Sequence, residues 1–148
     1  MRAILLTALF CLACGATATP AQTAPATVRF RSVDLVVDAV QPLAAYQLTF
    51  EAIVGDVRIV GIEGGEHAAY SEPPHYDPRA MMHDRVIIGD FSVAAADALP
   101  SGLVRVATLH LEIRGSAEPD FDVTLDVAAT TDGASIDAAV RPVDGESK

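Results

Sequence analysis

The chain has 148 residues, with 20 acidic and 10 basic side chains and a formal net charge of −10 at pH 7. This length predicts a single domain. The acidic composition disfavours nucleic acid and anionic lipid as partners, because binding to them depends on Lys and Arg neutralising phosphate.

The N-terminal segment has the three-part pattern of a secretory signal peptide. Arg2 gives a positive start, residues 3–16 form an apolar run, and small residues follow. We expect cleavage after Ala18, because Ala16 and Ala18 have the A-x-A spacing, with cleavage after Ala21 as the alternative. A bilayer span needs about 20 apolar residues, so we expect no stable membrane span and a secreted or periplasmic protein.

Residues 1–18 are therefore expected to be the signal peptide, and residues 19–27 a flexible leader. Both cysteines, Cys11 and Cys14, lie in the signal peptide. The residues before Cys14 match a lipobox poorly, so we do not expect a lipid anchor there. The mature chain has no cysteine, and its core must hold the fold without disulfides.

Apolar and polar side chains alternate with a period of two through residues 28–140, which is typical of half-buried β-strands. Strands are expected at residues 28–37, 45–52, 57–65, 85–93, 105–115, 120–128 and near 135–140. At least seven short strands with turn signals between them predict an all-β antiparallel β-sandwich. Residues 141–148 are expected to be a flexible C-terminal tail.

The same alternation predicts which side chains face the core. The inward set is expected to comprise Tyr46, Leu48, Phe50, Ala107, Leu109, Leu111, Ile113, Phe121, Val123, Leu125 and Val127. The first strand changes phase near Arg31 and Ser32, which indicates a β-bulge or a crossing between sheets.

Motifs of catalysis are missing from the mature sequence. It has no cysteine nucleophile, no G-x-S-x-G elbow, no phosphate loop and no H-E-x-x-H. Carboxylates such as Asp120 and Asp122 occupy alternate strand positions, which indicates a solvated edge. A catalytic carboxyl group needs burial to shift its pKa. No acidic segment has the spacing of a calcium loop. We therefore expect no enzymatic activity and no required cofactor.

A long connection between two strands, residues 64–84, concentrates the side chains most able to bind a ligand. One interpretation is a metal site, since imidazole and carboxylate suit zinc or copper. Its candidate ligands are His67, His75, His83 and Asp77.

Two other interpretations of this connection remain open. Tyr70 and Tyr76 are candidates to stack on a sugar ring beside carboxylates, which would make the protein a polysaccharide binder. Alternatively the segment folds over an end or edge of the sandwich. Its tyrosines and its methionines, Met81 and Met82, would then pack down while the histidines face solvent.

Three segments carry a resemblance to a known family. These are VDLVVDAVQPLAAYQLTFEA from Val33, VRIVGIEGGE from Val57, and VRVATLHLEIRG from Val104. Together they resemble the cohesin-like domains of secreted bacterial proteins over roughly residues 33–140. A first strand of type V-x-V-x-V, an L-x-V-x-x-V-x-x-G pattern and a late L-A-T-L-x-F-x-V strand are the features in common.

The resemblance implies a nine-stranded jelly-roll sandwich, related in fold to certain carbohydrate-binding modules. It also implies a protein–protein attachment module that grips a calcium-loaded dockerin through one sheet face, so calcium would enter through the partner. The family usually has Y-D-P after the second strand, whereas that place here holds residues 51–56 and Tyr76-Asp77-Pro78 lies in the later connection. No binding residue is therefore carried over.

Overall fold

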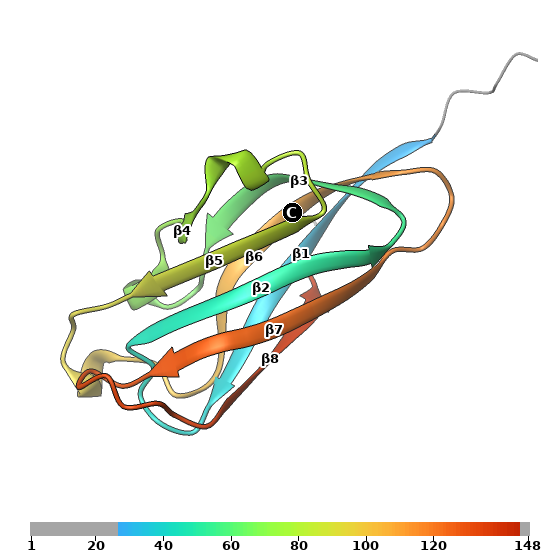
Figure 1. Ribbon diagram of the computed structural model, residues 1–148. Coiled ribbons are helices and arrows are strands. Elements are labelled where there is room, and N and C mark those ends of the chain that lie inside the picture. The colour runs from blue at the N-terminus through green and yellow to red at the C-terminus, as the bar shows by residue number, and fades with distance from the viewer. Residues whose placement is uncertain (1–26, 146–148) are drawn as a thin grey trace, which may run out of the picture.

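The computed structural model describes residues 27–145. The expected signal peptide, all but the last residue of the leader and the last three residues of the expected tail lie outside this range. The described chain forms two antiparallel four-stranded sheets, which confirms the predicted all-β sandwich, with eight strands where about nine were expected (Figure 1). The strands are β1 (Val28–Ala39), β2 (Ala45–Val54), β3 (Asp56–Gly64), β4 (His75–Tyr76), β5 (Arg85–Phe91), β6 (Gly102–Arg114), β7 (Asp120–Ala129) and β8 (Ala138–Asp144).

The first sheet has the strand order β3-β6-β1-β8 and the second sheet the order β4-β5-β2-β7. The chain changes sheet at each connection except the one from β4 to β5. In Figure 1 strands β5, β2 and β7 lie side by side in front of β6 and β1. The core lies between the two layers, as it does when each sheet buries one face.

The two-residue alternation sets the core as predicted in most strands. Leu48 and Phe50 of β2 have no exposed surface, and neither have Leu109, Leu111 and Ile113 of β6. Aliphatic side chains from both inner faces complete the core.

One inward prediction in β7 is wrong: Val127 is 44% exposed. The pairing of β7 with β2 shifts register between Gln47 and Leu48, which leaves Asp126 as an extra residue on β7. An inserted residue reverses the phase of everything after it. Val127 therefore points outward, while Phe121, Val123 and Leu125 stay partly buried against the core.

Two further details differ from the prediction: where the last strand ends, and where β1 shifts register. The last strand runs to Asp144 and pairs with β1, so residues 141–144 belong to the sandwich and not to a tail. Strand β1 is continuous through Arg31 and Ser32, and its register shift lies between Leu35 and Val36. The strand end and the register shift both depend on how β1 pairs with β6 and β8. Such pairing cannot be inferred from the sequence of a single segment.

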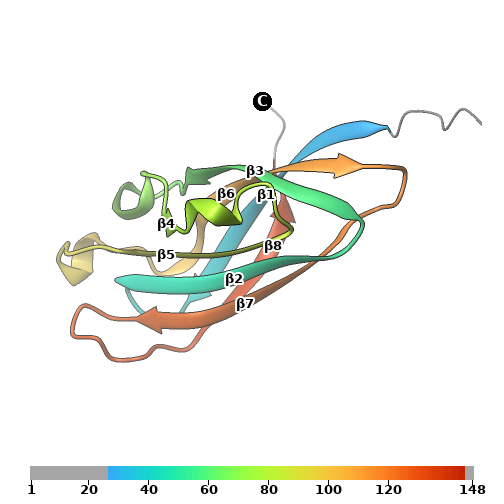
Figure 2. The same cartoon turned by 45° about the horizontal axis from the view of Figure 1, so that its top comes forward.

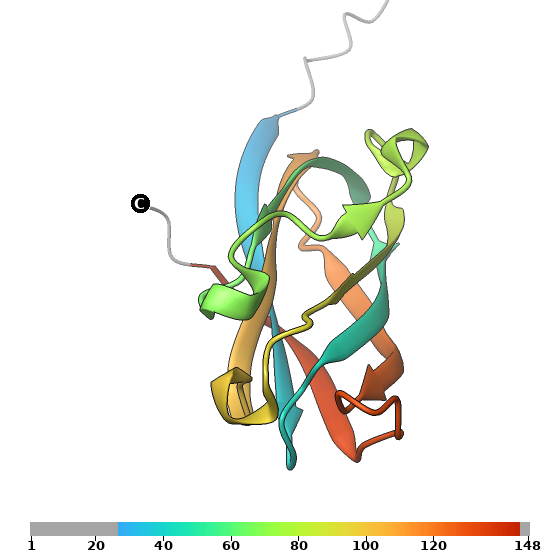
Figure 3. The same cartoon turned by 90° about the vertical axis from the view of Figure 1, so that its left-hand side faces the viewer.

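The connection between β3 and β5 closes one side of the sandwich. It holds two short 3-10 helices, η1 (Ala68–Tyr70) and η2 (Pro78–Ala80), with β4 between them. Its end covers the outer edge of β3, because Met82 N–H donates to the Ile59 carbonyl (2.8 Å) and Ile59 N–H donates to that of His83 (2.9 Å). Figures 2 and 3 show the segment beside β3 and β5. A covered edge resists pairing with another chain.

A third 3-10 helix, η3 (Ala96–Ala98), lies between β5 and β6. Within residues 27–145 no helix is long and apolar enough to cross a membrane.

Candidate functional site

The structure does not bring the candidate metal ligands together. His67 caps η1, where its Nδ1 accepts from Ala69 N–H (3.1 Å), and Asp77 caps η2, where it accepts from Arg79 N–H (2.9 Å). His75 lies exposed on β4 and His83 lies exposed beside the edge of β3. In residues 27–145 no group of three or more His, Cys, Asp or Glu side chains could hold a metal ion.

The two candidate sugar-stacking tyrosines differ in burial. Tyr70 is 1% exposed, its hydroxyl donates to the Leu43 carbonyl (2.5 Å), and its ring meets Tyr46 edge-on with centroids 5.2 Å apart. A ring buried in this way offers no face to a sugar. Tyr76 is half-buried, pairs with Ile88 of β5 and packs against the core.

Burial has an electrostatic consequence for the two interior tyrosines. It raises the pKa of Tyr46 and of Tyr70 far above the ordinary value, and the nearby Asp90 carboxylate adds to both shifts. The neutral hydroxyls keep their hydrogen bonds. The Tyr46 hydroxyl donates to the carbonyl of Val106, on the first sheet (3.2 Å).

A polar cluster that the sequence did not single out lies on the outer face of the first sheet. Ser32 Oγ is 3.0 Å from His110 Nδ1, and His110 Nε2 is 3.0 Å from Glu63 Oε1. The second approach lacks hydrogen-bond geometry, and Nε2 has no other partner among residues 27–145. The three side chains lie on neighbouring strands of an open sheet face. The three side chains form a polar network on this face of the first sheet.

The outer face of the second sheet has a different chemistry. Three rows of side chains cross β5, β2 and β7 there, and none of their nine members is charged. The rows are Ile87–Thr49–Thr124, Gly89–Gln47–Val127 and Phe91–Ala45–Ala129. We call these nine residues the neutral patch. Three of its members are large apolar side chains with much of their surface in solvent: Ile87 44%, Phe91 63% and Val127 44%.

Acidic side chains border the neutral patch. The next row along the strands is Arg85–Glu51–Asp122, in which Arg85 Nε lies 3.6 Å from Glu51 Oε2 and both side chains are about half exposed. The extra residue on β7, Asp126, stands between the patch members Thr124 and Val127, and it accepts from the Thr49 hydroxyl (2.9 Å). One border thus carries two carboxylates and one guanidinium, and a third carboxylate lies beside the paired positions of the patch.

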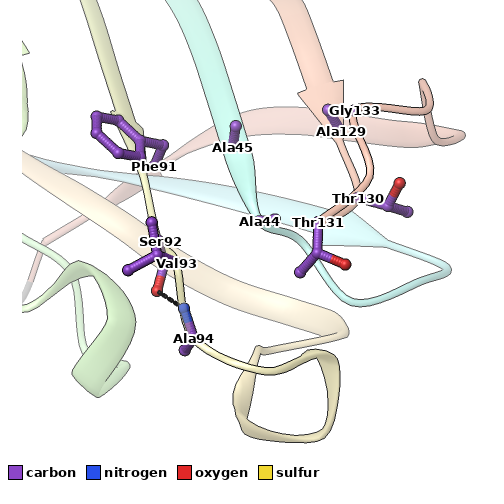
Figure 4. A pocket seen from close by; sticks show the side chains of 10 residues that line it. All are labelled: Ala44, Ala45, Phe91, Ser92, Val93, Ala94, Ala129, Thr130, Thr131 and Gly133. Carbon is purple, nitrogen blue, oxygen red and sulfur yellow. Dashed lines mark hydrogen bonds between the residues drawn. The ribbon is translucent and has the colours of Figure 1, made fainter.

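A pocket of about 370 Å³ adjoins the last row of the neutral patch. It lies between the start of β2, the segment after β5 and the turn after β7 (Figure 4). Its lining is uncharged: Ala44, Ala45, Phe91, Ser92, Val93, Ala94, Ala129, Thr130, Thr131 and Gly133.

The turn after β7 places one carboxylate beside this pocket. Asp132 lies between the lining residues Thr131 and Gly133 and is fully exposed, and it accepts a hydrogen bond from the Thr130 hydroxyl. That bond, helped by backbone N–H groups, lowers the pKa of Asp132 below its ordinary value. The turn that borders the pocket therefore carries a negative charge at neutral pH.

Comparison of the chain with protein-family models, with curated proteins and with solved structures finds no match. The function of this chain must therefore be inferred from its own surface. Part of the neutral patch was visible in the sequence, since Val86, Ile87 and Ile88 are three consecutive apolar residues of one strand. A strand with period two must turn the middle one outward.

Proposed function

We propose that residues 28–144 form an exported, non-catalytic binding module of the cohesin type, which attaches to a protein partner through the neutral patch. The observation that carries the proposal is the absence of charge from the nine patch positions in a chain with a net charge of −10. Interface centres are depleted of charged side chains and enriched in aromatic ones, with a polar rim around them.

The exposed apolar side chains support the same proposal. Ile87, Phe91 and Val127 lie on one face of three neighbouring strands, two on β5 and one on β7. Scattered exposed apolar residues are ordinary, whereas several of them on one uncharged sheet face with a polar border favour an interaction surface. The sequence resemblance adds that cohesin-like domains grip a dockerin through one sheet face.

The charged side chains around the neutral patch indicate the chemistry of the partner. Glu51, Asp122 and Asp126 outnumber Arg85 around the neutral patch. A complementary partner surface has an apolar centre with Lys or Arg around it. A calcium-loaded, dockerin-like protein with such a surface would bring its own calcium, and this chain would need no cofactor.

The experiment is a capture assay with the mature domain and the source organism's secreted and envelope proteins, with calcium and then with chelator. Three baits are compared: the unchanged domain, Ile87→Lys in the neutral patch, and Leu103→Lys as the control. Leu103 is an exposed aliphatic residue, 60% exposed, on the outer face of the first sheet.

The proposal expects one protein that the unchanged domain and Leu103→Lys capture, that Ile87→Lys does not, and that chelator releases. Capture that survives Ile87→Lys, or that Leu103→Lys abolishes, contradicts it. If no bait captures a protein and the domain binds a polysaccharide, the sugar-binding alternative replaces the proposal.

A further inference from the structure

The pocket beside the neutral patch has a lining suited to an apolar group. Alanines from β2 and β7 line it, and the exposed side chains of Phe91 and Val93 stand at one side. Val93 is 92% exposed, the highest value among the exposed large apolar side chains of residues 27–145. A β-branched side chain in that position gains nothing from the fold of the isolated domain.

The polar groups around the pocket are largely used within the protein. Ser92 N–H donates to the Ala44 carbonyl and Ala44 N–H donates to the Ala129 carbonyl, each at 2.8 Å. Ser92 Oγ accepts from Ala94 N–H (3.3 Å), and the Thr130 hydroxyl is engaged by Asp132. A sugar ring needs several convergent hydrogen-bonding groups, and the Thr131 hydroxyl with the remaining O–H of Ser92 is a poor supply.

We propose that this pocket is an anchor site for one branched aliphatic or aromatic side chain of a bound polypeptide that carries Lys or Arg next to that side chain. The basic neighbour is expected to reach Asp132, which lies on the turn that borders the pocket. The inference rests on the proposed function, since it names what part of the partner enters this end of the same surface. A volume of about 370 Å³ suits one large side chain and its flanking backbone.

The pocket and the neutral patch are continuous, which is why they are expected to act on one partner. Phe91, Ala45 and Ala129 belong to both. Apolar anchors buried in a pocket carry much of the affinity of a typical protein interface, and the flat surroundings exclude water.

The test is an NMR titration of the mature domain with four defined probes. The acetylated, amidated tripeptide Lys-Leu-Lys is compared with Lys-Ala-Lys, with Glu-Leu-Glu and with methyl glucoside. The proposal expects Lys-Leu-Lys to bind roughly tenfold more tightly than Lys-Ala-Lys, because a pocket discriminates about that strongly on a few methylenes. Glu-Leu-Glu, whose charge has the same sign as Asp132, and the glucoside, which has no apolar side chain, are expected to bind more weakly as well. The amide shifts are expected to lie at Ala44, Ser92 and Thr131.

Variants separate the two parts of the proposed recognition. Ala129→Leu fills the pocket and is expected to abolish the preference for Leu over Ala. Asp132→Asn removes the charge on the turn that borders the pocket and is expected to reduce the preference for Lys over Glu while leaving the preference for Leu. Ala139→Leu, at an exposed position of β8 on the first sheet, is the control and is expected to change neither. Each variant is first checked for an unchanged fold by its NMR spectrum, and Asp132→Asn carries the test alone if Ala129→Leu does not fold.

Equal binding of Lys-Leu-Lys and Lys-Ala-Lys overturns the proposal, as do tighter binding of the glucoside and shifts confined to other regions. The capture assay and the titration together distinguish failure of the anchor site from failure of the proposed function. If capture depends on Ile87 but Ala129→Leu leaves it intact, the anchor site is wrong and the function stands. If the tripeptide binds as expected but no captured protein depends on Ile87, the pocket stands and the proposed function fails.

Discussion

The outer faces of the two sheets differ in what their side chains bond to. On the first sheet the Thr108 hydroxyl donates to Asp34 (2.6 Å) and accepts from Arg105 (2.8 Å), and Arg114 donates to Glu112 (2.6 Å). On the second sheet the neutral patch has one such bond, from Thr49 to Asp126. Both faces have exposed apolar side chains, such as Phe30 and Leu103 on the first sheet. The first face bonds many of its polar side chains to one another, whereas the neutral patch has few polar groups and no charged member. Stability and recognition are thus expected to depend on opposite faces.

The largest effect is expected from a charge placed in the neutral patch. Ile87→Lys puts an ammonium group where the partner's apolar centre would lie, and it should weaken partner binding by about 2 kcal/mol, or roughly 30-fold. The free energy of unfolding should change by no more than about 0.5 kcal/mol, because Ile87 is on the surface. Titration calorimetry and urea unfolding measure the two quantities. Equal weakening by Leu103→Lys would remove the distinction between the faces.

The converse effect is expected on the first sheet from Thr108→Val. Thr108 is 7% exposed, and its loss leaves Asp34 and Arg105 without their shared partner. We expect the free energy of unfolding to fall by about 1–3 kcal/mol, with partner affinity unchanged. The matched variant is Thr124→Val in the neutral patch, where the side chain is exposed and the fold should be nearly unaffected. Similar losses of stability in both variants would contradict the account.

A pH dependence is expected from the interior between the two faces. Burial raises the pKa of Tyr46 and Tyr70 above the ordinary value of 10.0. The stability from their neutral state is therefore fully present below pH 10 and is lost as pH rises through and beyond that value. Urea unfolding on both sides of pH 10, with tyrosinate absorbance as a second signal, measures the loss. In Tyr70→Phe the slope above pH 10 should be shallower; an unchanged slope would mean that Tyr70 ionises without unfolding.

The smallest effect is expected at the border of the neutral patch. The Arg85–Glu51 pair is 3.6 Å apart and about half exposed, so it should contribute only a few tenths of a kcal/mol to folding. Glu51→Gln is predicted to leave the urea midpoint almost unchanged. It should, however, reduce the dependence of partner association on salt, which stopped-flow measurements at two ionic strengths would show. A salt dependence equal to that of the unchanged domain would exclude Glu51 from the binding surface.

The sequence predicted the layers of the fold because period-two alternation is a local property. Leu48 and Phe50 on β2 and Leu109 on β6 are buried as expected. What it could not predict depends on pairing between distant strands. The extra residue Asp126 turns Val127 outward only because of how β7 pairs with β2.

The candidate site shows the same difference between what is local in sequence and what depends on strand pairing. Histidines and tyrosines close in sequence made residues 64–84 look like a binding loop, yet Tyr70 is drawn into the core and His67 caps a 3-10 helix. The neutral patch gathers Ile87, Thr49 and Thr124 from three strands far apart in the chain. Ile87 alone was visible, as an apolar residue at an outward position.

The central claim is that partners bind the outer face of the second sheet. Methyl NMR of the labelled domain, titrated with the captured partner, tests it most directly. The account predicts that the methyl signals of Ile87, Val127 and Val93 shift or broaden, while those of Leu103 and Val143 on the first sheet stay in place. Shifts at Leu103 and Val143 with an unchanged Ile87 would contradict it.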